Sequence, residues 1–155
     1  MTGYLSNEQV EELLRNSFIG RIGCTDGEKV YVVPVSFVYT GDYLVVHSRE
    51  GLKLEMMRQH PRLCFEVERI RSAEDWQCVI IQGRFEELTS EEDKYYANRL
   101  LVEKQLKLRA PQHFRPPHIA ENRNQQSHST ENQVITYRLV IDEKTGRYEL
   151  PVTAP

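Results

Sequence analysis

The sequence predicts a mainly β protein, in which six or seven antiparallel strands form a small barrel with helices at its periphery. Short apolar runs rich in Val, Ile, Tyr and Phe recur along the chain, as in strands. Turn sequences of the hairpin type, Asp26-Gly27 and Thr40-Gly41-Asp42, separate neighbouring runs. Only three helical stretches interrupt the strands, which favours hairpins over strand-helix-strand crossovers.

The first helix is predicted from a capping box at Ser6-Asn7-Glu8-Gln9, with Ser6 as N-cap. It ends near Arg15-Asn16, and Val10, Leu13 and Leu14 form its apolar stripe.

Two strands follow, Ile19–Thr25 and Val30–Tyr39, joined by the Asp26-Gly27 turn. The second alternates imperfectly, which predicts burial on both faces. Pro34 lacks a backbone donor, so this strand is expected to be an edge, a bulge or a splayed segment at that point.

The middle of the chain is expected to hold a helix at Leu52–Gln59, which Pro61 ends. A glycine, Gly83, lies within the longest of the predicted strands, where another backbone or a ligand can approach closely. The three strands expected here are Tyr43–His47, Leu63–Glu68 and Trp76–Leu88.

The third helix begins at Thr89-Ser90-Glu91-Glu92, where acidic residues favour a helix N-terminus. Residues 109–133 are polar and contain three prolines, a pattern typical of a long loop that is a working lid or disordered. A strand at Val134–Ile141 and a turn at Thr145–Tyr148 into a short last strand complete the prediction.

Length, charge and cysteine content limit the classes of protein to which this chain can belong. A chain of 155 residues fits one domain, 1–155, and a net charge of −3 argues against nucleic acid as the main partner. The sequence shows no membrane-helix or signal-peptide pattern, so a soluble, cytoplasmic protein is expected. Its three cysteines, Cys24, Cys64 and Cys78, form no CxxC pair and are expected to be buried free thiols.

The stretch from Pro34 to Lys53 carries the chemistry. A predicted strand pair ends on His47-Ser48-x-x-x-x-Lys53, which places hydroxyl, ammonium and backbone N–H groups beside an apolar wall. Such groups suit a flat aromatic ligand that carries a phosphate.

An ordered series of motifs resembles the pyridoxamine 5′-phosphate oxidase-like proteins, which are FMN-binding split barrels of Greek-key type, and within them the nitroimidazole-resistance reductase branch. The resemblance is dense over about residues 16–105, and the arginine set with which the oxidase itself holds its substrate phosphate is missing. The matching segments are Gly20-Arg21-Ile22-Gly23, Tyr31–Tyr39, His47-Ser48-x-x-Gly51-x-Lys53-Leu54, His60-Pro61-Arg62, Cys64-Phe65-Glu66-Val67, Trp76, Val79, Gly83-Arg84, Glu86-Glu87 and Thr145-Gly146-Arg147.

The resemblance implies a homodimer with FMN between the subunits. Ser48 and Lys53 are then expected to hold the phosphate, with His47 beside it or facing the substrate as a proton donor. His47 can equally be a hydrogen-bonded strand-end residue, and Trp76 an anchor of the dimer. The ring is expected to contact Pro34, Val35, Ser36, Phe37 and Val38 of one chain, and Trp76, Gln82 and Gly83 of the other.

The implied activity is FMN-dependent reduction of a small electron-poor substrate, such as a nitroaromatic or quinone-like compound. The alternative is a flavin- or haem-binding module without turnover, a sensor or carrier. A deazaflavin ranks lower, because its longer tail needs a wider basic groove than Lys53 alone supplies. No metal site is expected: the remaining histidines, at 113, 118 and 128, match no familiar ligand spacing, although they could serve as axial haem ligands.

Overall fold

The computed structural model describes residues 1–108 and 133–152 as one seven-stranded antiparallel sheet with three helices. The strands are β1 (Thr2–Tyr4), β2 (Ile19–Thr25), β3 (Val30–Tyr39), β4 (Tyr43–Arg49), β5 (Arg62–Ser72), β6 (Asp75–Glu87) and β7 (Val134–Glu149). The helices are α1 (Asn7–Asn16), α2 (Leu52–Gln59) and α3 (Glu91–Leu108).

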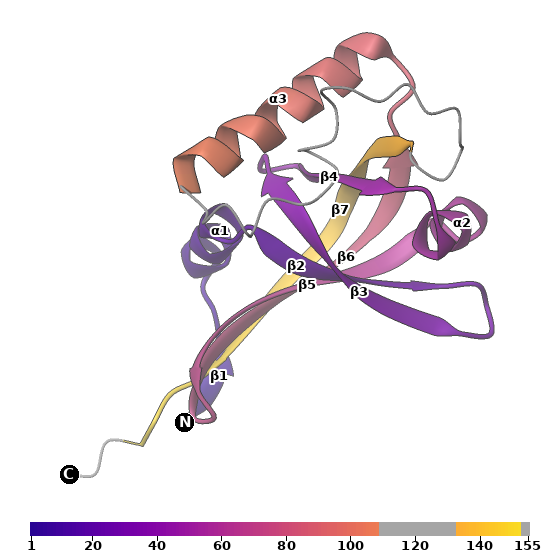
Figure 1. Cartoon of the computed structure of the whole chain (residues 1–155). Coiled ribbons are helices and arrows are strands. Elements are labelled where there is room, and N and C mark those ends of the chain that lie inside the picture. The colour runs from indigo at the N-terminus through magenta and orange to yellow at the C-terminus, as the bar shows by residue number, and fades with distance from the viewer. Residues whose placement is uncertain (109–132, 153–155) are drawn as a thin grey trace.

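The sheet closes on itself. Its strand order is β1-β7-β4-β3-β2-β5-β6, and β7 also pairs with β6, so six strands form a ring and β1 extends it at β7 (Figure 1). Strands β2, β3 and β4 follow one another, and β5 returns to lie beside β2, which is a Greek-key arrangement. The predicted mainly β barrel is therefore confirmed.

Apolar side chains from all six ring strands and from α1 and α2 fill the barrel. Phe37 and Phe65 meet edge to face there, with their ring centroids 5.0 Å apart. A second cluster lies outside the ring, where α3 covers β4: Val45 packs with Leu88, Ala97 and Leu101. Figure 1 shows α3 crossing this side of the barrel. Strand β4 is thus covered on both faces.

Several helices and strands have the bounds that the sequence predicts. The capping box at Ser6 and Gln9 is present, α1 and α2 span the predicted residues, and β2 and β3 begin and end as predicted. Both hairpin turns have a glycine at positive φ, Gly27 at 98° and Gly41 at 108°. The three cysteines are free; Cys24 is buried, whereas Cys64 and Cys78 are only partly buried.

Strand β3 departs from the prediction of burial on both faces. It pairs with β4 only from Phe37 onward, so the half before that residue has β2 as its one partner. Val30 and Val32 in this half are 78% and 61% exposed. Pro34 lies in the same half, and the prediction of an edge at this proline is confirmed.

The predicted turn at Thr145–Tyr148 is wrong, because β7 runs without interruption from Val134 to Glu149. Strand β6 is long enough to pair with it as far as Glu149. Gly146 serves packing instead: a Cβ atom there would lie 2.8 Å from both Leu5 Cβ and Val10 Cγ2. The short N-terminal strand β1, which pairs with the end of β7, was not predicted.

Replacing Gly146 with alanine is expected to lower the free energy of unfolding by about 1–3 kcal/mol, because the new methyl group overpacks the contact between α1 and β7. Urea denaturation measures the change. Gly23→Ala is the matched strand control, since its Cβ would meet only ordinary contacts at 3.7 Å or more. Equal stability of the two variants would contradict this account of Gly146.

Candidate functional site

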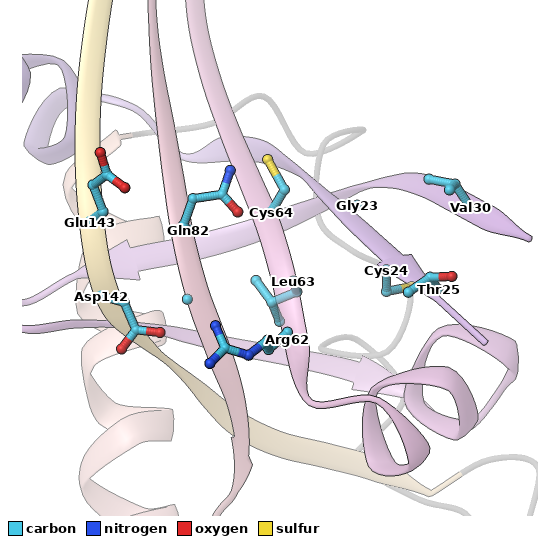
Figure 2. A pocket seen from close by; sticks show the side chains of 11 residues that line it. Gly23, Cys24, Thr25, Val30, Arg62, Leu63, Cys64, Gln82, Asp142 and Glu143 are labelled. Atoms are coloured by element: carbon cyan, nitrogen blue, oxygen red, sulfur yellow. The ribbon is translucent and has the colours of Figure 1, made fainter. Parts of the chain in front are cut away.

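A cleft of about 580 Å³ is lined by residues of five strands, β2, β3, β5, β6 and β7. Gly23, Cys64, Gln82 and Glu143 are successive partners in one row across β2, β5, β6 and β7. Because Gly23 has no side chain, the row is open at that strand (Figure 2). The lining residues are Gly23, Cys24, Thr25, Val30, Arg62, Leu63, Cys64, Gln82, Gly83, Asp142 and Glu143.

A β-bulge shapes one wall of the cleft. Gln82 pairs with Glu143 but Gly83 pairs with Ile141, which leaves Asp142 as the extra residue of β7. The close backbone approach expected at Gly83 is present, because a Cβ atom there would lie 2.4 Å from the carbonyl oxygen of Val140. Asp142 accepts hydrogen bonds from Arg84 Nε at 3.2 and 3.3 Å.

Lys53 lies beside this cleft, in the first turn of α2. It lies near Cys24, one of the lining residues: its positive charge lowers the pKa of that thiol, although burial raises this pKa by more. Burial lowers the pKa of Lys53, and within residues 1–108 and 133–152 no hydrogen-bonding or ion-pair partner compensates its charge. A partly desolvated cation without an acceptor favours an anionic ligand.

The hydroxyl of Ser48, which was predicted to bind the phosphate, points toward Tyr137. Ser48 is buried, and its Oγ donates a hydrogen bond to the phenol oxygen of Tyr137 at 3.2 Å. Burial raises the pKa of Tyr137 well above its usual range, so this phenol is neutral at all ordinary pH values. Ser48 can therefore reach a phosphate only if it rotates away from Tyr137.

His47 is only 9% exposed. Side chains alternate along a strand, so His47 shares a face with Val45, which packs against α3. Its neighbour across the sheet is Thr136, whose hydroxyl donates a hydrogen bond to Asn98 of α3. The imidazole thus belongs to the side of β4 that α3 covers.

The β3 residues expected at the ring do not line the cleft. Val35 and Phe37 point into the core, and Val38 packs against the α3 cluster. Pro34 is exposed, Ser36 and Val38 are half-buried, and Pro34 is therefore the most accessible of the five. The backbone N–H of Phe37 already donates to the carbonyl of Phe18 at 3.1 Å.

Trp76 lies at the start of β6, away from the cleft. Its indole Nε1 donates a hydrogen bond to Glu149 at 3.0 Å. The structure therefore brings Gln82, Gly83 and Lys53 close to one cleft, while the other predicted ligands lie on β3, on β4 or at the far end of β6. Their roles toward a cofactor stay predictions.

Nine of the eleven lining residues were not predicted as site residues: Gly23, Cys24, Thr25, Val30, Arg62, Leu63, Cys64, Asp142 and Glu143. The available signal was the family resemblance, because Gly23, Arg62 and Cys64 belong to the motifs that carry it. Asp142 becomes a lining residue only through the bulge, which no sequence pattern announces.

Another unpredicted cation, Lys104 of α3, lies at the other end of β3. Its ammonium sits 4.8 Å from the ring centroid of Phe37 and donates a hydrogen bond to the carbonyl of Ser17, which caps the end of α1. Burial lowers the pKa of Lys104 to about 8. This lysine holds the end of α3 against α1 and β3 and is not turned to the cleft.

No group of three or more His, Cys, Asp or Glu side chains within the described part of the chain could hold a metal ion. His113, His118 and His128 and the predicted loop at 109–133 lie outside the described residues, apart from Gln133. None of the three described helices has the length and apolar character needed to cross a membrane.

A family model for pyridoxamine 5′-phosphate oxidase matches residues 6–148. The chain belongs to this family. The match confirms the resemblance drawn from the motifs, and it covers the strand ring and the residues beside the cleft.

Comparison with known proteins finds one relative in sequence and several similar folds. An uncharacterised protein of Rhizobium meliloti is 26% identical over 84 residues, which are 54% of this chain and 56% of that protein. A FAD-binding protein of Mesorhizobium loti has a TM-score of 0.72 at 22% identity, covering 97% of this chain and 98% of its own. A candidate 5-nitroimidazole antibiotic resistance protein of Bacteroides thetaiotaomicron has a TM-score of 0.68 at 21% identity, covering 96% and 87%. The TM-scores of these two structures show a shared fold, and at identities of 22% and 21% they show the fold alone.

Because the folded pKa of Lys104 is about 8 and the ordinary value is 10.5, the unfolded chain binds more protons between these values. The contribution of Lys104 to stability therefore rises with pH across that window. We expect the free energy of unfolding of the wild type to increase relative to Lys104→Met from pH 8 to 10.5, as measured by urea denaturation. Parallel pH profiles would show that Lys104 titrates normally in the fold.

Proposed function

We propose that this protein is a homodimeric flavoprotein that binds FMN beside the cleft and reduces small electron-poor substrates, such as nitroaromatic or quinone-like compounds. The observation that carries the proposal is Lys53, a partly buried cation without a compensating partner among the described residues, next to a cleft in a protein of this family. FMN, when bound, supplies hydride chemistry for which the protein needs no nucleophile of its own.

The residues of the chain fit such a cofactor. The ammonium of Lys53 supplies a point charge for a phosphate dianion. Gln82 and the backbone at Gly83 supply polar groups at the cleft wall, while Leu63 and Val30 supply apolar surface. His47 stays the proposed proton donor, but it lies on the side of β4 that α3 covers and is not among the residues that line the cleft.

A second copy of the chain is the proposed partner. The single-partnered half of β3 exposes Val30, Val32 and Tyr31 together with the unpaired backbone edge of the strand. An apolar strand edge of this kind is usually covered in the assembled protein. Under this proposal Lys53, Gln82 and Gly83 of one subunit lie beside the same flavin, and the second copy covers the exposed half of β3.

The test is the visible spectrum of the purified protein, with its mass measured by light scattering in the same run. Two flavin bands on a species of twice 18.2 kDa are expected. Anaerobic addition of NADH or NADPH, with and without a nitroaromatic, then separates a reductase from a binding module. A single strong Soret band would instead establish the haem alternative, and a colourless protein that FMN does not titrate would refute the flavin proposal.

Lys53→Ala is expected to weaken FMN binding by about 1–3 kcal/mol, which is the usual cost of leaving a charged hydrogen bond unmade. Riboflavin, which lacks the phosphate, is expected to bind both proteins equally. Fluorescence titration of the two ligands measures this difference. Lys29→Ala, at an exposed lysine in the β2–β3 turn, is the matched control. Unchanged FMN affinity in Lys53→Ala would remove this lysine from the site.

A further inference from the structure

Arg58 joins three elements through one guanidinium group. It donates hydrogen bonds to both carboxylate oxygens of Glu87, at 2.9 and 3.1 Å. It also donates to both carboxylate oxygens of Glu50, one of them at 3.2 Å. Isolated surface ion pairs contribute little, but a doubly bidentate arrangement fixes its partners in orientation as well as distance.

Glu50, Arg58 and Glu87 lie at the ends of the elements that carry the candidate site residues. Glu50 directly follows β4, the strand that carries His47 and Ser48. Glu87 is the last residue of β6, which carries Gln82 and Gly83 at the cleft. Arg58 lies in the last turn of α2, whose first turn carries Lys53. One side chain therefore ties the helix of the candidate phosphate ligand to both neighbouring strands.

Helix α2 is short and weakly capped, so contacts to the rest of the fold fix its position. It has eight residues, and its N-cap, Gly51, provides no side-chain hydrogen bond. Helices this short are not stable by themselves in water. Burial of Leu54, Met56 and Met57 holds one side of α2 against the core, and Arg58 holds its end. The place of α2 in turn decides where the flexible side chain of Lys53 can reach.

We propose that Arg58 is a positioning residue for the flavin phosphate: through Glu50 and Glu87 it sets α2 so that the ammonium of Lys53 meets the phosphate beside the cleft. This inference rests on the proposed function and deepens it. Arg58 donates its hydrogen bonds to Glu50 and Glu87, so we do not propose that it binds the phosphate itself.

The charge of the cluster provides a sharp test. Removing the Glu87 carboxylate makes the region more positive, so long-range attraction alone would strengthen FMN binding. Positioning predicts the opposite sign, because α2 loses half of its tie. Glu86→Gln is the matched control: Glu86 precedes Glu87 on β6 and accepts a hydrogen bond from Arg138 of β7, without contact to α2.

The experiment is titration of FMN and riboflavin into the full-length wild type, Glu87→Gln, Glu86→Gln and Arg58→Lys. Glu87→Gln is expected to raise the FMN dissociation constant about three- to tenfold, the worth of one weakened charged hydrogen bond. Riboflavin affinity is expected to stay within about twofold of the wild type, because α2 offers it no phosphate contact. Arg58→Lys, which keeps the charge but loses the planar fork, is expected to act like Glu87→Gln.

Tighter FMN binding in Glu87→Gln, or an effect equal to that of Glu86→Gln, would overturn the proposal. Loss of FMN and riboflavin affinity by the same factor would overturn it too, by showing a merely structural role. Should Glu87→Gln fail to fold, Arg58→Lys carries the same comparison. A wild type that binds neither ligand would instead refute the proposed function itself, which keeps the two failures distinct.

Discussion

Ring closure through β7 is the constraint on which the rest of the structure depends. This strand of sixteen residues pairs with β4 along its first half and with β6 along almost its whole length. Without it, β4 and β6 would be the two edges of an open sheet, and the apolar interior would face solvent. The bulge at Asp142 is part of the same pairing, so closure of the barrel and the shape of the cleft wall have a common origin.

This protein has two contrasting kinds of cationic side chain, arginines paired with carboxylates and two partly buried lysines without a carboxylate partner among the described residues. Arg21, Arg58 and Arg138 each contact carboxylates, and in each case hydrogen bonding to the acid raises the pKa of the guanidinium. Lys53 and Lys104 differ from these arginines, because burial lowers the pKa of both amines. Lys104 has a backbone carbonyl and an aromatic ring as its compensation, whereas Lys53 lies near the cleft residue Cys24 and has no hydrogen-bonding or ion-pair partner among the described residues. This difference separates an amine that serves packing from one that suits a ligand.

The motif His47-Ser48-x-x-x-x-Lys53 illustrates how contiguous residues take on different environments. Its lysine lies beside the cleft, its serine faces Tyr137 inside the barrel, and its histidine lies on the side covered by α3. Strand alternation separates the histidine from the serine, and the start of a helix redirects the lysine. A site described from the motif alone would have placed all three groups together.

The sequence by itself determined β2, β3, their hairpin turns and the capping box of α1, because these depend on local periodicity, on glycine at positive φ and on side chains that bond to the nearest backbone. It also determined the family, through an ordered series of short motifs. Only the tertiary structure decided that β7 is continuous, how far the edge predicted at Pro34 extends along β3, and that Arg58 joins α2 to Glu50 and Glu87. Each of these depends on pairing between segments distant in sequence, where the length and register of the partner strand outweigh local turn signals.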